Sequence, residues 1–141
     1  MKHYTSIVPF ELAVKLKNAG FPQKPGLNYY QIPEGMPGAG YVGNPENYDS
    51  EQFWEYKEKI YSAPTYADVI DWFFEKGIFI QMEPWHTFAL QERMGFVYEI
   101  NTVNEEKAKI DSEVWNDFAS FGLCINAAIE RAIELIEKAT E

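Results

Sequence analysis

The sequence has only one cysteine and no long apolar run, and each of these two shortages excludes a class of protein. A single thiol, Cys124, forms no intramolecular disulfide and no all-cysteine metal site. No window approaches the roughly 18 uninterrupted apolar residues of a membrane-spanning helix. The N-terminus also lacks the apolar stretch and small-residue cleavage site of a signal peptide. These absences predict a cytoplasmic protein that does not associate with a membrane.

The sequence also lacks the common motifs of catalytic chemistry. It contains no Gly-x-Gly-x-x-Gly, no phosphate loop, no Gly-x-Ser-x-Gly elbow and no His-Glu-x-x-His. The glycines of residues 35–43 have neither a preceding apolar strand nor a following helix, so we expect no phosphate-binding loop there. We predict no metal and no cofactor. Enzyme activity is left open, and a non-enzymatic role is favoured.

Positive charge is the other quantity in short supply. The chain has 22 acidic and 12 basic side chains, for a net charge of −10. Phosphate contacts dominate affinity for nucleic acids, and most of this surface would repel them. We therefore predict no direct nucleic-acid binding. The acidity serves either solubility alone or attraction to a basic protein surface.

The size and the aromatic content of the chain predict a fold that needs no disulfide. At 141 residues the chain is near the most common size of one domain, and it holds four Trp, nine Tyr and ten Phe. We predict a single domain over residues 1–141. Cys124 lies in an apolar run, so it is expected to be a buried core residue and not a catalytic thiolate.

Helix signals are clear at the N-terminal end. Pro9 suits a first helical turn, and Gly20 is expected as the left-handed residue that ends a helix over 9–19, with Phe21 folding back on Leu16. A second helical piece is predicted to begin at Asp49, which has the spacing of a capping box with Gln52. Its aromatic face would hold Phe53, Trp54, Tyr56, Ile60 and Tyr61.

The segment between these helices is rich in proline, glycine and tyrosine. Five Pro and five Gly fall within residues 22–50. Long loops of this kind in compact domains are often functional or disordered. The rings favour an ordered loop packed by its own side chains, with a short strand at Tyr29–Ile32.

The second half of the chain predicts helix, three strands and helix over about 65–139. Thr65 caps a helix that ends at Gly77, with an expected buried stripe of Val69, Ile70, Phe73 and Phe74. Strands are expected at 78–83, 85–90 and 96–100, separated by Pro84 and a turn at 92–95.

Residues 104–109 are charged and expected to be solvated, and a short helical turn is expected at 112–118. Ser120 then caps a final helix. Its inner face is expected to hold Leu123, Ile125, Ala128, Ile129, Ala132, Ile133 and Ile136.

The predicted fold is therefore α+β. We expect a two-layer sandwich in which a three-stranded antiparallel meander packs against helices, with the long Pro/Gly/Tyr-rich loop of residues 22–50 attached.

Part of the sequence resembles a known group of small proteins. The block Ala63–Phe73 begins a helix with Ala-Pro-Thr, contains a Trp-Phe pair, and is followed by the strand Gly77–Ile80. This pattern is similar to small, functionally uncharacterised proteins of Bacteroidetes phages and mobile elements. The resemblance covers about two-thirds of the chain, outside most of 22–50, and implies a mobile-element setting. It transfers no catalytic residue.

Two sets of residues are candidate sites. His86, with Glu83 nearby in a possible pocket, is either a general base or one metal ligand, or an ordinary strand position that faces solvent or hydrogen-bonds a neighbour. Six aromatic residues in and after the loop either anchor that loop or contact a partner. They are Tyr29, Tyr30, Tyr41, Tyr48, Trp54 and Tyr56.

These features predict an acidic protein-interaction module of phage or mobile-element origin, with a protein partner. One form of this prediction is an inhibitor of a basic host protein. The alternative is a small enzyme or ligand-binding domain with a pocket under the 22–50 loop near His86. A homodimer through an exposed sheet face or edge is a further prediction.

Overall fold

The computed structural model describes residues 7–24, 26–32, 34–35, 37–41, 45–48, 60–86, 94–104, 109–118 and 120–139. The chain divides into two compact units. We call Thr5–Tyr66 the N-terminal unit and Ala67–Glu141 the C-terminal unit. Both combine helix with antiparallel sheet, so the predicted α+β class is confirmed. A single domain over 1–141 stays a prediction.

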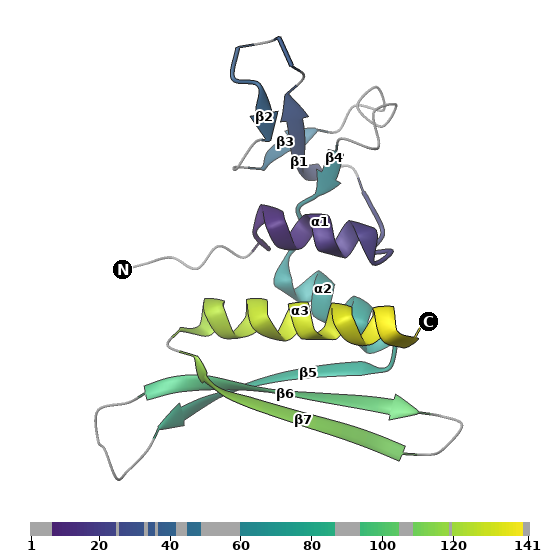
Figure 1. Ribbon diagram of the computed structural model, residues 1–141, viewed down its shortest axis with the longest axis vertical. Helices are drawn as coiled ribbons and strands as arrows, with labels where there is room; N and C mark the ends of the chain where they lie inside the picture. The colour runs from purple at the N-terminus through teal and green to yellow at the C-terminus, as the bar shows by residue number, and fades with distance from the viewer. Residues whose placement is uncertain are drawn as a thin grey trace. The chain divides into compact units, whose positions relative to one another are not determined.

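The described residues of the N-terminal unit form one helix and four short strands (Figure 1). These elements are α1 (Phe10–Asn18), β1 (Gly26–Ile32), β2 (Gly40–Tyr41), β3 (Glu46–Tyr48) and β4 (Ile60–Ser62). The strand β1 is central and pairs antiparallel with each of the others. Asn28 of β1 is opposite both Glu46 of β3 and Ser62 of β4.

The helix α1 begins and ends as its sequence predicts. Pro9 is the N-cap. The last turn closes with two hydrogen bonds, from the Gly20 N–H to the Lys17 carbonyl and from the Phe21 N–H to the Leu16 carbonyl. Gly20 has φ +98°, which glycine adopts without a Cβ penalty. The helix predicted over 9–19 is confirmed.

The short strand predicted at Tyr29–Ile32 is confirmed as part of β1. The rest of the long loop predicted over residues 22–50 is wrong in its described part, because β2, β3 and the start of β1 also fall there. Gly35 and Gly38 have positive φ between β1 and β2, so the glycines make turns between strands. The predicted helix from Asp49 is wrong at its end, since Ile60 and Tyr61 belong to β4. Residues 49–59 are outside the described part of the chain.

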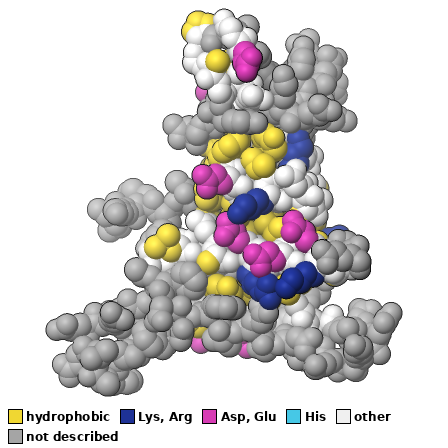
Figure 2. All heavy atoms as spheres, viewed as in Figure 1, with side chains coloured by type: hydrophobic (Ala, Val, Ile, Leu, Met, Phe, Trp, Pro, Cys, Tyr) yellow, Lys and Arg dark blue, Asp and Glu magenta, His cyan; other side chains and the backbone are white. Residues whose placement is uncertain are grey.

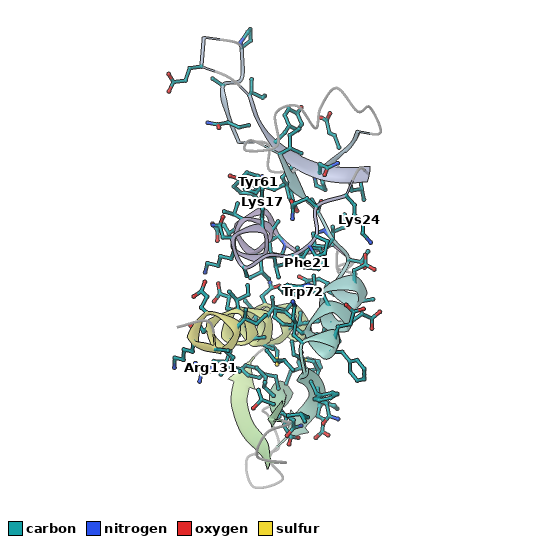
Figure 3. All side chains as sticks on the ribbon, turned by 90° about the vertical axis from the view of Figure 1, so that its right-hand side faces the viewer. Lys17, Phe21, Lys24, Tyr61, Trp72 and Arg131 are labelled. Atoms are coloured by element: carbon teal, nitrogen blue, oxygen red, sulfur yellow. The ribbon has the colours of Figure 1, made fainter. Side chains whose placement is uncertain are left out.

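The C-terminal unit has a sheet in the order β5-β6-β7, with both helices on one face of it (Figures 1 and 3). Its elements are α2 (Tyr66–Glu75, whose first residue belongs to the N-terminal unit), β5 (Ile78–His86), β6 (Met94–Asn104), β7 (Lys109–Phe118) and α3 (Phe121–Ala139). The long helix α3 packs against all three strands.

Alternate residues of β5 and β6 form the core under α3. Ile78, Ile80 and Ile100 are buried there, and the Met82 Sδ atom is 3.7 Å from the Cys124 Sγ atom of α3. The neighbouring positions face the other side of the sheet, since strand side chains alternate. No described element of the C-terminal unit covers that second face, which we call the open face (Figures 1 and 3).

The expected break at Pro84 does not occur, and β5 runs through it to His86. The Val103 N–H donates to the Gly77 carbonyl over 3.0 Å, which makes Gly77 and Val103 a hydrogen-bonded pair. Hydrogen-bonded pairs alternate along an antiparallel ladder, so Pro84, opposite Phe96, has a non-hydrogen-bonded position. Its missing N–H would point away from β6, at a free edge that tolerates proline.

The third strand of the sheet is not the one expected. Residues 109–118 form β7, where the sequence analysis expected the end of a solvated stretch and a short helical turn. The predicted strand at 85–90 is wrong at its described start, since Trp85 and His86 complete β5. The pairing of β7 with β6 is non-local, so local helical propensity could not reveal it.

In both α2 and α3, the buried face differs slightly from the predicted one. In α2, Trp72 and Phe73 are buried, whereas Phe74 is 60% exposed. In α3, Cys124 is fully buried and Leu123 is 60% exposed. The Ser120 Oγ accepts the Leu123 N–H over 3.2 Å, so the predicted N-cap is confirmed.

Candidate interaction surface

Negative charge is divided unequally between the two units. Residues 67–141 hold 15 acidic and 6 basic side chains, a net charge of −9. Residues 5–66 hold 7 acidic and 5 basic side chains, a net charge of −2. The acidity of the chain is therefore a property of the C-terminal unit.

The exposed sides of both helices contribute to this charge. Exposed carboxylates occur on α2 at Asp68, Asp71 and Glu75, and on α3 at Glu130, Glu134 and Glu137. Arg131 of α3 forms an ion pair of 2.9 Å with Glu134, and the ammonium of Lys76, which directly follows α2, lies over the Trp72 ring. Figure 2 shows acidic and basic side chains next to each other over α3. An exposed ion pair such as Arg131–Glu134 contributes little stability.

A partly exposed apolar patch lies where α2 turns into β5, with Phe74 exposed and Phe79 half-buried. The Phe74 and Phe79 rings pack edge to face, with centroids 4.9 Å apart and an interplanar angle of 89°. Val103, which is 42% exposed, lies two residues beyond Asn101, the partner of Phe79 in β6. Diagonal neighbours of this kind share a face of the sheet. We call Phe74, Phe79 and Val103 the apolar patch.

The open face extends this patch with acidic and polar side chains. On β5 it holds the exposed Gln81 and Glu83, and on β6 it holds the half-buried Val97, Glu99 and Asn101. The described side chains of β5 and β6 on this face include two carboxylates and no cation. The face is therefore acidic as well as partly apolar.

The six predicted aromatic residues do not form one exposed cluster among the described residues. Tyr29 is only 4% exposed, its ring packs edge to face on Phe10, and its hydroxyl donates to the Val8 carbonyl over 2.8 Å. Burial raises the pKa of Tyr29, and the nearby Tyr66 adds to the shift. Tyr29 is thus an anchor of the N-terminal unit, as the packing alternative predicts.

The structure describes the other five aromatic residues to different extents. Tyr30 is half-buried on β1. Tyr41 and Tyr48 are placed by their backbones, in β2 and β3, and their side chains are outside the described part. Trp54 and Tyr56 lie wholly outside it. A partner contact through these rings stays a prediction.

The predicted pocket pair lies at the far end of β5. Glu83 is exposed on the open face, and the backbone of His86 ends the strand opposite Met94. The His86 side chain is outside the described part of the chain. What is described is an exposed carboxylate on a sheet face.

Cys124 is confirmed as a core residue. Its side chain has no solvent exposure, and burial raises the pKa of the thiol to about 11. At neutral pH almost all of it is therefore protonated, whereas a nucleophilic cysteine requires the thiolate. Its contact with Met82 joins α3 to β5.

A set of side-chain to backbone hydrogen bonds holds the β1–β4 part of the N-terminal unit. The Ser62 Oγ accepts the Lys24 N–H over 2.8 Å and donates to the Lys24 carbonyl over 3.1 Å. The Ser62 N–H donates to the Gln23 Oε1 over 2.8 Å. Asn28 donates from Nδ2 to the Gly26 carbonyl, while its buried Oδ1 has no hydrogen-bond donor among the described residues. These bonds stabilise short strands that have little apolar area.

Lys17 joins α1 to β4 in the same unit. Its ammonium donates to the Ile60 carbonyl over 2.8 Å and lies 4.7 Å from the centroid of the Tyr61 ring (Figure 3). Phe10 packs on the same ring, with centroids 5.8 Å apart. This cation is therefore part of the packing of the unit, and its charge is partly shielded.

Searches for matching protein families, curated proteins and solved structures found no match. Within the described residues, no group of three or more His, Cys, Asp or Glu side chains is placed to hold a metal ion. No helix among those residues is both long enough and apolar enough to cross a membrane.

The apolar patch is the feature that sequence reasoning missed. Its signal was present in the run Trp72-Phe73-Phe74. Successive residues of a helix point about 100° apart, so three consecutive rings cannot all face one core. At least one of them had to be exposed.

Proposed function

We propose that this chain is an acidic protein-interaction module of phage or mobile-element origin, which binds a basic partner protein in the cytoplasm through its C-terminal unit. The observation that carries the proposal is the net charge of −9 in residues 67–141. A charge of this size attracts cationic surfaces and speeds association with them.

The two-layer arrangement of α2 and α3 on the sheet supports this role, because it leaves exposed carboxylates on both helices and on the open face. One form of the function is inhibition of a host protein that normally binds nucleic acid, since the carboxylates of this chain and the phosphates of nucleic acid would compete for the same basic surface. The alternative of a small enzyme or ligand binder stays a prediction, and no observation among the described residues favours it.

The test is capture of partners from a lysate of a Bacteroidetes host with the tagged full-length chain. Bound proteins are identified by mass spectrometry after washes at about 0.1 M and about 1 M salt, over which the Debye length falls from about 10 to about 3 Å. The identified partner is then purified and its Kd measured across the same range. The proposal expects a basic partner whose affinity falls at least about tenfold at high salt. A partner of acidic surface, or a salt-independent Kd, contradicts it.

A further inference from the structure

The apolar patch is built on fixed backbone geometry. The Gly77 N–H donates to the Phe74 carbonyl over 3.0 Å, and the Gly77 carbonyl accepts the Val103 N–H over 3.0 Å. Gly77 has φ +80°, a conformation that favours glycine. The turn from α2 to β5 therefore holds Phe74 against Phe79 in the free chain, and Phe79 shares its sheet face with Val103. A preformed surface of this kind loses less conformational entropy on binding.

Carboxylates border the patch on two sides. Asp71 and Glu75 are exposed on α2, one turn before Phe74 and directly after it. Glu99 lies on the open face opposite Gln81, the next β5 position on the face of Phe79. The cation that follows on the chain is Lys76, whose ammonium lies 5.6 Å from the Trp72 ring centroid.

This arrangement has the anatomy of a protein-binding surface. Exposed aromatic residues at the centre of a contact carry much of the binding energy, and a polar rim sets specificity. Here the centre is apolar and the rim is mostly acidic. The chemistry that complements it is an apolar side chain between lysine or arginine residues.

We propose that Phe74, Phe79 and Val103, with Asp71 and Glu75 at their rim, bind a partner segment in which apolar side chains alternate with lysine or arginine. The inference rests on the proposed function and names its contact surface. Charge selects this occupant over a second copy of the chain, since self-association through the patch would place Asp71 and Glu75 beside identical carboxylates.

The test uses the full-length ¹⁵N-labelled chain and three synthetic peptides with blocked ends. The first alternates leucine and lysine, the second replaces each leucine with serine, and the third replaces each lysine with glutamate. The expected result is that the leucine–lysine peptide binds at least about tenfold more tightly than either other peptide, and that its amide shift changes centre on Phe74, Phe79 and Val103.

Matched variants connect the binding to the patch. Phe74→Ser is expected to weaken the leucine–lysine peptide about tenfold, and Val103→Thr, which keeps a β-branched side chain in the strand, a few fold. Leu123→Ser is the control, because Leu123 is also 60% exposed on a helix but lies outside the patch. It is expected to leave the Kd unchanged. Thermal unfolding of each variant verifies that it is folded.

The outcomes separate this surface from the proposed function. Three results would contradict the assignment of binding to the apolar patch. They are equal binding of the leucine–lysine and serine–lysine peptides, equal binding by Phe74→Ser and the wild type, and no binding of the leucine–lysine peptide. A dimer in light scattering that Phe74→Ser dissociates also overturns that assignment, in favour of self-association. In each case a basic partner captured from lysate would still support the proposed function, whereas failure of that capture counts against the function alone.

Discussion

The two units of this chain are stabilised in different ways. The C-terminal unit has long strands and a 19-residue helix whose inner face is aliphatic, so burial of apolar side chains dominates its stability. The N-terminal unit has strands of two to seven residues and relies on side chains that hydrogen bond to backbone, such as Ser62, Gln23 and Tyr29.

Charge follows the same division. The unit with the larger apolar core carries a net charge of −9, while the other carries −2. A well-packed core tolerates the self-repulsion of a strongly charged surface better than a small core does. The comparison indicates that the larger apolar core and most of the negative charge both lie in residues 67–141. Three changes to the chain test the structural side of this comparison.

The largest expected effect is loss of core packing under α2. Phe73 is fully buried and Phe74 is 60% exposed, although they are neighbours. Phe73→Ala should lower the free energy of unfolding by about 4 kcal/mol. Phe74→Ala should lower it by less than about 1 kcal/mol. Urea denaturation measures both, and similar losses would mean that α2 is rotated from the orientation described here.

An intermediate effect is expected from alkaline pH on the C-terminal unit. The pKa of the Cys124 thiol is about 11 in the folded chain, against 9.0 for the free group. Because the folded value is the higher one, the unfolded chain loses its proton first as pH rises. The stability linked to this group is complete below about pH 9 and is lost by about pH 11, on the order of 3 kcal/mol.

The measurement is unfolding of wild type and Cys124→Ala between pH 8 and 11, with the pH dependence of the two curves compared. The wild type should lose more stability across this range than the variant. Parallel curves would show that Cys124 is accessible to solvent in the folded chain.

The smallest effects are expected from replacing one serine in each unit by alanine. Ser62→Ala removes two hydrogen bonds to Lys24 in a buried position, and should cost about 2 kcal/mol. Ser120→Ala removes only the N-cap bond to Leu123, and should cost about 1 kcal/mol. Chemical denaturation distinguishes the two. A larger loss for Ser120→Ala would contradict the view that the N-terminal unit depends more on such bonds.

The helices could be predicted from the sequence because their signals are local. Pro9 and Gly20 mark the ends of α1, and Ser120 marks the start of α3, each through bonds within a few residues. Local signals also gave the α+β class. They failed to predict which single residues of a helix face the core. Phe74 and Leu123 were expected to be buried and are exposed, because the rotation of a helix depends on distant elements that it packs against.

The strands were harder because their partners are distant in sequence. Residues 109–118 alternate charged and apolar side chains irregularly, and become a strand only by pairing with β6. Pro84 suggested a break because its position on the free edge of β5 is not visible in the sequence. The apolar patch combines residues from α2, β5 and β6, so its members could be guessed only one at a time.

The most direct test of the central claim compares two triple variants in binding the purified basic partner captured from lysate. Asp68→Asn, Asp71→Asn and Glu75→Gln together remove three exposed charges from α2, and Glu11→Gln, Glu34→Gln and Glu46→Gln remove three exposed charges from the N-terminal unit. Both variants have the same change in net charge. We predict that the first raises the Kd at least about tenfold and the second less than about twofold. Equal effects, or a larger effect of the second variant, would contradict the assignment of partner binding to the C-terminal unit.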